Sequence, residues 1–380
     1  MSDAKSTRMR LHRQSKSSQR SVAMTENHKK FIEYAGNEPI SQSGQVVMFM
    51  LMFKDNDRFI EMNYNKLTDD IFITKTIMVD NSEPFLFELV KELAFMRILQ
   101  KMCVKYVICG ALLTKLHEQK NNKIKAVMHM EYFGPSLVSY INIKLSYSQI
   151  ITLMYNMSLG LQYIHEMGFV HRDVKPDNIV VNTDTLDIKY IDFGSACMDP
   201  EYVPQTITNE NIKLLSHKTE ELSLQLSRHD METCLHKAVG TPFFIAPELI
   251  ISANDDDLKH FGIPEWKKAD IWSLGVTFYE LLTGTYPFTS NNKQDLLHKI
   301  VDKKNYNRVE DERFSFINQM LDKDPESRIT VQKLIRLISS RINEIYSVIP
   351  LPNVPILSKS RSASIRSNMM RKTSKWALTI

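Results

Sequence analysis

Three short motifs rich in charged and polar residues follow one another in the middle of the chain. They are His171-Arg172-Asp173-Val174-Lys175-Pro176-Asp177-Asn178, Asp192-Phe193-Gly194 and Ala246-Pro247-Glu248. Asp173 precedes Asn178 by five residues, and Asn178 precedes Asp192 by fourteen. Oxygen atoms of such side chains are the ligands that a hard ion such as Mg²⁺ takes. One tripeptide of this kind is common but the ordered set is rare, so we expect the motifs to act at one site.

The residues between Asn178 and Asp192 predict a β-hairpin. Two β-branched runs, residues 179–181 and 188–191, flank the polar cluster Asn182-Thr183-Asp184-Thr185. β-branched runs favour strands, and a cluster of Asn, Asp and Thr favours a turn. Such a hairpin would place Asn178 and Asp192 at neighbouring strand ends, where both can reach one ion.

The three motifs resemble those of eukaryotic-type protein kinases. The resemblance implies that Asp173 accepts the proton of the substrate hydroxyl and that Lys175 neutralises charge on the γ-phosphate of ATP. It also implies that Asn178 and Asp192 are Mg²⁺ ligands, so ATP and Mg²⁺ are the expected cofactors. Phosphoryl transfer depends mainly on positioning and electrostatic stabilisation, which these groups would supply.

Two details resemble the serine/threonine branch of that family. Lys175 lies two residues after Asp173, where tyrosine kinases usually carry other residues. Thr241 matches a threonine that bonds to the catalytic aspartate and lysine. The resemblance therefore implies transfer to serine and threonine of protein substrates, and Asp177 could favour basic residues before the target.

The segment before the first motif predicts a long amphipathic helix. Ser146 and Gln149 form the capping-box pattern of a helix start. The apolar residues that follow recur every three or four positions: Ile150, Met154, Met157, Leu161 and Ile164. The helix is expected to end at Met167-Gly168, where the family has the end of its own long helix.

Three charged residues match supporting positions of the family. Asp270 matches an aspartate that holds the backbone of the catalytic loop, although it could also be an ordinary helix cap. Glu248 and Arg328 match a buried ion pair. We expect this pair to support the fold and to take no part in the chemistry.

Lys75 is the central charge of an apolar, strand-like run. By resemblance it would bind the α- and β-phosphates and pair with a helix glutamate. Glu92 is the preferred partner because Met96 and Leu99 follow it at helical spacing. Glu88 is the alternative partner, but the residue four positions after it is Glu92 and not an apolar residue. Lys75 could instead protect an edge strand against aggregation.

Two features of this region depart from the family pattern. Ile73 stands where the family usually has alanine, which leaves room for adenine. Only Gly44 and Val46 fit the glycine-rich loop, and Ser41 and Ser43 stand where two glycines are usual. Serine lacks the freedom of glycine at positive φ. We expect the fold to be kept and both the ATP affinity and the rate to be affected. A polar insertion, residues 54–70, precedes Lys75.

Residues 130–137 resemble the hinge between the two kinase lobes. Met130 would be the gatekeeper, and the backbone of Glu131 and Phe133 would face adenine. The run Gly134-Pro135-Ser136-Leu137 resembles the casein kinase 1 and vaccinia-related kinase group. The chain departs from the first of these by keeping its Ala-Pro-Glu motif.

The resemblance implies an α+β, bilobal kinase fold with a small β-rich N-terminal lobe, one main helix in that lobe, and a larger, mainly helical C-terminal lobe. The expected parts are a basic tail at 1–30, the N-terminal lobe at 31–130, the C-terminal lobe at 131–345 and a basic Ser-rich tail at 346–380. The activation segment is long, and its excess lies at about 205–237. This insert is either a solvated loop or a docking or autoinhibitory element.

Arg172 precedes the expected catalytic base. In kinases with this arginine, a phosphorylated activation segment often pairs with it through charge-assisted hydrogen bonds. Phosphorylation of the activation segment is therefore expected to raise activity.

The net charge of +4 over 380 residues is unevenly distributed. Residues 1–30 hold eight Lys/Arg and two Asp/Glu, and residues 351–380 hold six and none. Such tails are either solubilising disorder or arms for an acidic partner, nucleic acid or an anionic membrane. Aromatic residues do not alternate with the basic ones, so specific nucleic-acid recognition is not expected.

The four cysteines, Cys103, Cys109, Cys197 and Cys234, have no CxxC spacing. We expect buried or incidental thiols in a reducing compartment and no metal site. The chain has no apolar run of transmembrane length and no apolar core of a secretory signal near its start. The expected location is the cytoplasm, with the nucleus or a host-cell cytoplasm as alternatives.

Three functions remain as hypotheses. The preferred one is an active, ATP- and Mg²⁺-dependent serine/threonine protein kinase. The second is a pseudokinase scaffold, which Ile73 and the incomplete glycine-rich loop favour. The third is a kinase-fold enzyme acting on a small molecule, which the Ala-Pro-Glu motif and the long activation segment oppose.

Overall fold

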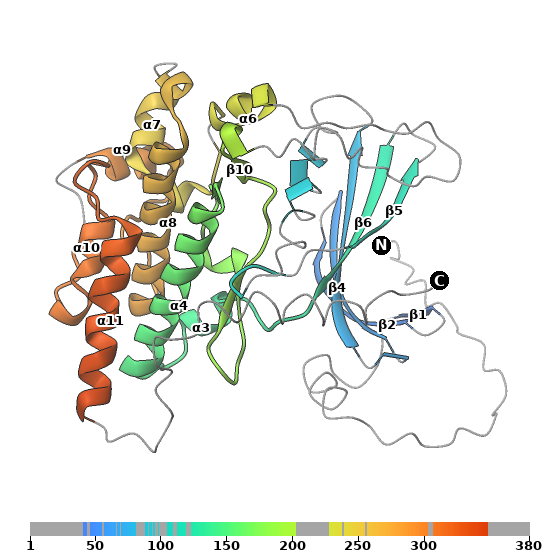
Figure 1. Cartoon of the computed structure of the whole chain (residues 1–380), viewed down its shortest axis with the longest axis horizontal. Helices are drawn as coiled ribbons and strands as arrows, with labels where there is room; N and C mark the ends of the chain where they lie inside the picture. The colour runs from blue at the N-terminus through green and yellow to red at the C-terminus, as the bar shows by residue number, and fades with distance from the viewer. Residues whose placement is uncertain are drawn as a thin grey trace, which may run out of the picture.

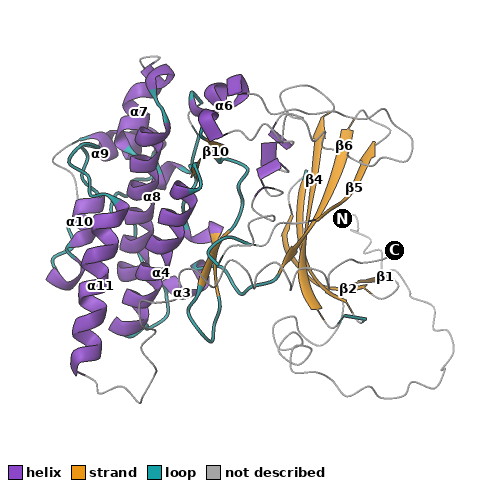
Figure 2. Cartoon of the chain, viewed as in Figure 1, coloured by secondary structure: helices purple, strands orange, loops and turns teal. Residues whose placement is uncertain are grey.

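The computed structural model describes residues 41–43, 46–54, 57–65, 67–68, 70–80, 88–89, 91–92, 94–95, 98, 105–108, 112–118, 123–202, 228–237, 239–254, 257–302 and 307–348. They form a sheet lobe and a mainly helical lobe (Figure 1). Figure 2 separates the two by colour, with the long orange strands in one lobe and most purple helices in the other. The expected α+β bilobal architecture is confirmed. Gly44, residues 1–30 and most of the activation-segment excess lie outside the described residues.

The sheet lobe is built on six antiparallel strands in the order β1-β2-β3-β4-β6-β5. The strands are β1 (Ser41–Ser43), β2 (Val46–Lys54), β3 (Arg58–Asn65), β4 (Asp70–Asp80), β5 (Leu112–Glu118) and β6 (Lys123–Glu131). In β6 alternate side chains are buried, and Ile124, Ala126 and Met128 pack with Leu89. This alternation is typical of a sheet with one covered face.

One alternative and one expectation for this lobe are wrong. Lys75 lies on β4, which pairs with β3 on one side and β6 on the other, so it does not protect an edge. Most of the expected insertion at 54–70 is β3, which aligns residue by residue with β4. The polar residue Asn63 is buried in this strand, where its side chain donates a hydrogen bond to Thr74 Oγ1 at 2.9 Å.

The segment that carries Glu92 is helical at positions 88, 89, 91, 92, 94, 95 and 98. It packs inward through Leu89 and Phe95, both of which are buried. The Phe95 ring meets the Phe169 ring edge to face at 5.1 Å, which joins this helical segment to the helical lobe. Met96 and Leu99 lie outside the described residues.

The helical lobe surrounds two long buried helices, α4 (Tyr147–Glu166) and α8 (Ile263–Thr283). The others are α3 (Val138–Ile141), α6 (Arg228–Leu235), α7 (Pro247–Asn254), α9 (Lys293–Val301), α10 (Phe316–Met320) and α11 (Val331–Val348). Short 3₁₀ helices span Pro176–Asn178, Pro200–Tyr202, Pro242–Phe244, Asp257–His260 and Glu312–Phe314. α11 packs along α4 at the outer side of the lobe (Figure 1). No helix among the described residues is both long and apolar enough to cross a membrane.

The expected helix before the catalytic motif is confirmed as α4. Ser146 accepts a hydrogen bond from the Gln149 backbone, and the Gln149 side chain accepts one from the Ser146 backbone. The helix ends at Glu166, and Gly168 then adopts a φ of 79°. A left-handed residue just after a helix favours glycine because glycine has no Cβ to clash.

The expected hairpin is confirmed as β8 (Ile179–Val181) and β9 (Ile188–Tyr190). The Asn182 side chain accepts hydrogen bonds from the backbone N–H groups of Asp184 and Thr185, which closes the turn. Two further short strands, β7 (Phe169–Val170) and β10 (Cys197–Met198), pair with each other, and β7 ends directly before the catalytic loop.

The expectation of unpaired thiols is wrong for Cys197 and Cys234. They form a disulfide across 37 residues, with the Cα atoms 6.2 Å apart. Such a long-range pair leaves no spacing signature in the sequence, because the fold and not local geometry brings the sulfur atoms together. The other two cysteines lie outside the described residues.

Candidate active site

Asp173 lies at the centre of a network of polar side chains. Its Oδ1 accepts a hydrogen bond from Thr241 Oγ1 at 2.8 Å. Its Oδ2 lies 2.8 Å from Lys175 Nζ and accepts a hydrogen bond from Asn178 Nδ2 at 3.0 Å. Lys175 Nζ also donates to Thr241 Oγ1 at 2.7 Å. The carboxylate is therefore fixed in orientation and has a cation beside it.

The backbone of this loop is held from beneath by Asp270 on α8. The two carboxylate oxygens accept hydrogen bonds from the N–H groups of His171 and Arg172, at 2.9 and 2.8 Å. His165 Nε2 lies 2.9 Å from Asp270 Oδ2. Arg172 has a φ of 66°, a left-handed conformation that is uncommon for residues other than glycine. Asp270 therefore stabilises a strained turn, which is the expected role and goes beyond a helix cap.

Lys75 lies between two carboxylates at the junction of the lobes. Its Nζ is 2.5 Å from Glu92 Oε1 and 3.0 Å from Asp192 Oδ1. Glu92 is thus its partner, and the alternative Glu88 pairs with Lys91 and Lys237 instead. Burial alone would lower the pKa of Lys75, but the attraction of the two carboxylates outweighs it and raises the pKa above its usual value. Lys75 is therefore a cation at neutral pH.

Asp192, the second carboxylate beside Lys75, lines the cleft between the lobes. Burial by itself raises the pKa of Asp192, but the Lys75 ammonium outweighs burial and holds that pKa below its ordinary value. Its φ is 59°, so the residue turns out of the regular backbone path. The carboxylate is ionised at neutral pH, and 41% of the side chain is exposed.

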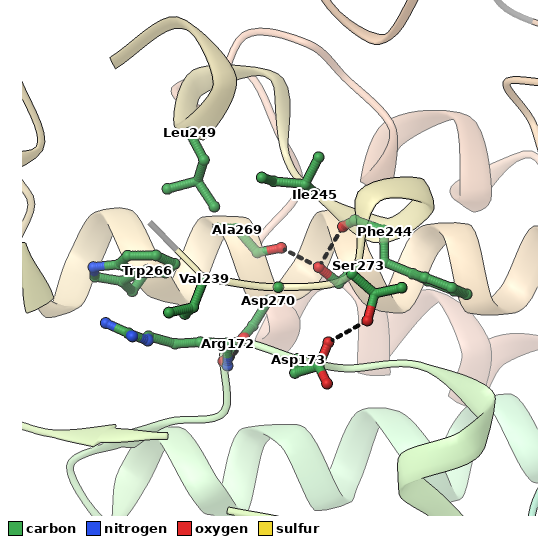
Figure 3. A pocket seen from close by; sticks show the side chains of 12 residues that line it. Arg172, Asp173, Val239, Phe244, Ile245, Leu249, Trp266, Ala269, Asp270 and Ser273 are labelled. Carbon is green, nitrogen blue, oxygen red and sulfur yellow. Dashed lines mark hydrogen bonds between the residues drawn. The ribbon is translucent and has the colours of Figure 1, made fainter. Parts of the chain in front are cut away.

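A cleft of about 450 Å³ opens between the lobes. It is lined from the sheet lobe by Ile73, Lys75 and Glu92 and from the helical lobe by Lys175, Asn178 and Asp192, among others. Glu131 and Phe133 line it at the hinge, as does the expected gatekeeper Met130. Asp173 borders a much smaller cavity beside Thr241 and Ile245 (Figure 3). Val46 is the first residue of β2, and the structure describes its backbone but not its side chain.

Asn178 and Asp192 fit a hard divalent metal. The Asn178 amide nitrogen donates to the backbone and side-chain oxygens of Asp173, at 2.8 and 3.0 Å. Both amide hydrogens are then used, so the amide oxygen is the atom left to bind a cation. Together with the Asp192 carboxylate it offers the oxygen ligands that Mg²⁺ prefers. No cluster of three or more His, Cys, Asp or Glu suited to a metal occurs among the described residues.

The hinge carries an interaction that the sequence analysis missed. Lys189 of β9 forms an ion pair with the Glu131 side chain, and its ammonium lies 4.8 Å from the centre of the Phe133 ring. These two contacts of Lys189 join the hinge to the β8–β9 hairpin below the cleft. A charge inside an otherwise apolar strand was the available signal.

A second missed feature is an acidic pair near the catalytic loop. Tyr286 donates a hydrogen bond to Glu280, and the charge of Asp177 acts on both residues. Burial raises the pKa of Glu280, Tyr286 opposes the rise, and Asp177 adds to it. Glu280 Oε2 is buried and has no hydrogen-bond partner among the described residues. Asp177 and Glu280 are therefore two neighbouring carboxyl groups whose like charges repel.

Glu248 and Arg328 form the expected buried ion pair. Arg328 Nη1 and Nη2 donate to the two carboxylate oxygens of Glu248 at 2.6 and 2.8 Å. Arg328 also donates to the carbonyl oxygens of Asp322 and Lys268. Its side chain is fully buried. The pair joins the Ala-Pro-Glu motif to the end of the lobe.

Comparison with known protein families gives one domain match. Residues 60–337 match the family described as protein kinase domain. This range covers most of the chain and includes Lys75, Asp173 and Asp192.

Comparison with curated proteins gives relatives that carry kinase names. Serine/threonine-protein kinase ELM1 of Saccharomyces cerevisiae is 35% identical over 49% of this chain and 26% of its own length. Serine/threonine-protein kinase ssp1 of Schizosaccharomyces pombe is 32% identical over 54% of this chain and 28% of its own length. CBL-interacting serine/threonine-protein kinase 8 of Arabidopsis thaliana is 27% identical over 77% of this chain and 54% of its own length. The chain thus spans a quarter to about half of the length of these relatives.

Proposed function

Because this chain belongs to the protein kinase domain family, we propose that it transfers the γ-phosphate of ATP to serine and threonine hydroxyls of protein substrates. The observation that carries the proposal is the geometry around Asp173, whose carboxylate is held by Thr241 and lies beside Lys175. The kinase names of its relatives support the same activity.

In the proposed reaction, Asp173 accepts the proton of the attacking hydroxyl. The hydroxyl oxygen forms a bond to the γ-phosphorus as the bond from that phosphorus to the ADP oxygen breaks. Lys175, 2.8 Å from Asp173, is placed to neutralise charge on the transferred group. Such positioning and charge stabilisation are what phosphoryl transfer requires from a protein.

Asn178 and Asp192 are the proposed ligands of Mg²⁺, which would neutralise charge on the phosphates when bound. Lys75, oriented by Glu92 and Asp192, would bind the α- and β-phosphates of ATP. Glu131 and Phe133 would meet adenine at the hinge. Gly44 and Val46 remain candidates from the sequence for covering the phosphates.

Two alternatives are weaker. A pseudokinase scaffold would not need the intact set of Lys75, Asp173, Asn178 and Asp192, and the relatives described above carry kinase names. A small-molecule kinase would not need the Ala-Pro-Glu motif and its Arg328 partner, which in the protein kinase family support the platform for protein substrates.

The proposal also extends to the substrate sequence, the kinase group, a partner and the location. Asp177 and Glu280 favour a protein substrate with a basic residue near the target hydroxyl, since their field favours positive charge. The resemblance of residues 134–137 to the casein kinase 1 and vaccinia-related kinase group stays a prediction, and none of the relatives described above carries either name. An acidic partner for the basic tails and a cytoplasmic location are likewise proposed.

The testing experiment is phosphate transfer from labelled ATP and Mg²⁺ by the purified full chain, to itself and to peptides that differ only in one basic residue. Wild type should label serine or threonine. Asp173→Asn should lower the transfer by about 10²- to 10⁴-fold. Asp177→Asn serves as the matched control, because it should keep transfer to the neutral peptide and lose only the preference for the basic one. Absence of transfer by wild type under all these conditions would overturn the proposal.

A further inference from the structure

Helix α6 of the activation segment lies beside β10, between the helical lobe and the sheet lobe (Figure 1). Cys234 of α6 and Cys197 of β10 form a disulfide. Both cysteines are buried. β10 in turn pairs with β7, and Cys197 aligns with Val170, immediately before the catalytic motif. The disulfide therefore attaches α6 to the β7–β10 strand pair, whose strand β7 ends directly before the catalytic loop.

The C-terminal end of α6 is bound by two side chains of the helical lobe. Arg172 Nη1 donates to the Cys234 carbonyl at 2.5 Å, and Trp266 Nε1 donates to the Leu235 carbonyl at 2.8 Å. The last carbonyls of a helix have no partner within the helix, and a cation there also complements the helix dipole. The Arg172 guanidinium stacks over the Trp266 ring (Figure 3), and its Cζ lies 4.4 Å from the ring centre.

Arg172 is therefore engaged before any phosphate is present. It also donates from Nε to the Ser195 carbonyl at 2.9 Å. Burial lowers the pKa of its guanidinium to about 10 against the attraction of Asp270 and Glu88, so it remains charged at neutral pH. α6 thus occupies, through a backbone carbonyl, the arginine that the sequence analysis assigned to a phosphorylated residue.

The other side of α6 meets the helical segment that carries Glu92. Lys91 Nζ lies 3.8 Å from Cys234 Sγ and 2.6 Å from Glu88 Oε2. Lys237, just after α6, lies 3.4 Å from Glu88 Oε1. Lys91 is the neighbour of Glu92, which pairs with Lys75. The position of α6 is therefore connected to both halves of the cleft.

We propose that Cys197 and Cys234 are a thiol–disulfide switch in which the disulfide holds α6 against the catalytic loop and the Glu92 segment, and its reduction releases α6 and lowers kinase activity. The activity part of the proposal rests on the proposed function; the attachment of α6 does not. Disulfides in reducing compartments are usually transient and redox-sensing, which suits a pair at this position.

The switching step is exchange with a small disulfide such as oxidised glutathione. The two cysteine thiols lose two electrons and two protons in total, one protein S–S bond forms, and the small disulfide is reduced to two thiols. Reduced glutathione drives the reverse reaction. The thiolate is the species that attacks a disulfide, and Lys91 Nζ lies 3.8 Å from Cys234 Sγ. Because both sulfur atoms are buried, exchange requires α6 to move first.

The test uses the full chain with Cys103→Ser and Cys109→Ser, which leaves the proposed pair as its two cysteines. Samples are equilibrated in reduced and oxidised glutathione, free thiols are counted by alkylation and mass spectrometry, and hydrogen exchange of α6 amides is followed. The oxidised form should have no free thiol, and its α6 amides should exchange at least about tenfold more slowly than in the reduced form. Two free thiols after oxidation, or equal exchange in both forms, would overturn the switch.

Phosphate transfer by the same samples then tests the coupling to activity. The oxidised form should be at least about threefold more active, since release of α6 affects positioning and not the reacting groups themselves. Cys234→Ser in the natural background should behave as the reduced form and ignore the redox buffer, whereas Cys103→Ser should still respond. Slow exchange of α6 without any phosphate transfer would contradict the proposed function and the coupling, and would leave the attachment of α6 standing. Equal activity of the two forms would overturn the coupling alone.

Discussion

In the helical lobe, Asp270 binds the backbone of the catalytic loop, and the loop side chains bind one another through Thr241. In the sheet lobe, Lys75 is positioned by the side chains of Glu92 and Asp192, which come from two other segments. The first arrangement holds a backbone against a buried core. The second depends on long charged side chains that meet across the junction of the lobes.

The difference separates stability from catalytic alignment. Supports buried in the helical lobe are needed for folding, because losing one partner leaves a charge without solvent or counter-charge. Side chains at the lobe junction can be changed with less cost to folding, because Lys75 has a second carboxylate and Asp192 reaches solvent. Substitutions in the first region should therefore lower stability, and those in the second should lower phosphate transfer.

The largest expected effect is on stability in the helical lobe. Arg328→Met should lower the free energy of unfolding by about 3–5 kcal/mol, because it leaves the Glu248 carboxylate buried without its partner. Denaturant unfolding followed by circular dichroism measures this loss. Arg313→Met is the matched control, since Arg313 pairs with Asp311 at the surface, and its unfolding midpoint should stay near that of wild type. Equal losses for both variants would contradict the account.

The counterpart in the sheet lobe is Glu92→Gln. The substitution keeps the shape of the side chain but removes its charge, so Lys75 should shift toward Asp192. We expect phosphate transfer to fall by about 10²-fold through misplacement of Lys75, with little change in the unfolding midpoint. Glu88→Gln tests specificity, because Glu88 pairs with Lys91 and Lys237 and should matter much less. A similar loss of transfer in both variants would contradict the assignment of Glu92.

A smaller effect is expected at Ile73, which lines the cleft together with Val180 and Phe133. Ile73→Ala should tighten ATP binding about fivefold, because the isoleucine occupies room that adenine needs, as in an overpacked contact. Equilibrium binding of ATP measures it. Ile71→Ala is the control, since Ile71 packs on the Met62 and Tyr64 cluster and is not among the cleft residues. Weaker ATP binding by Ile73→Ala would show that isoleucine supports adenine.

The smallest expected effect is the pH dependence that Asp192 contributes. Its pKa in the folded protein lies below that of the unfolded chain, about 3.9. Its contribution to stability is therefore fully present above that pH and is lost as the pH falls through the folded value. The difference in unfolding free energy between wild type and Asp192→Asn should be constant above about pH 5 and decrease below about pH 4. The decrease should be smaller in a Lys75→Met background, and an unchanged decrease would show that Lys75 is not the cause.

Local patterns in the sequence predicted the elements that local interactions form. The capping residues Ser146 and Gln149 and the helical spacing after them placed α4 correctly. The alternation of β-branched runs and turn residues placed the hairpin between Asn178 and Asp192. The Lys75–Glu92 pair followed from helical spacing together with the family resemblance.

Contacts between distant segments could not be predicted in the same way. The disulfide of Cys197 and Cys234 spans 37 residues, and the Lys189–Glu131 ion pair joins a hairpin to the hinge. Neither leaves a periodic pattern, because each depends on how complete lobes pack. The binding of Arg172 to a carbonyl of α6 was missed for a related reason: the acceptor is backbone, and the sequence does not show which carbonyl lies nearby.

The most direct test of the account measures ATP binding and phosphate transfer separately in wild type, Asp173→Asn and Lys75→Met. Asp173→Asn should lower transfer by about 10²- to 10⁴-fold, as loss of a general base does, while the ATP dissociation constant should stay within about threefold. Lys75→Met should weaken ATP binding as well as transfer, because its charge meets the phosphates. Transfer by Asp173→Asn at the wild-type rate, or unchanged ATP binding and transfer in Lys75→Met, would contradict the division of roles between the two lobes.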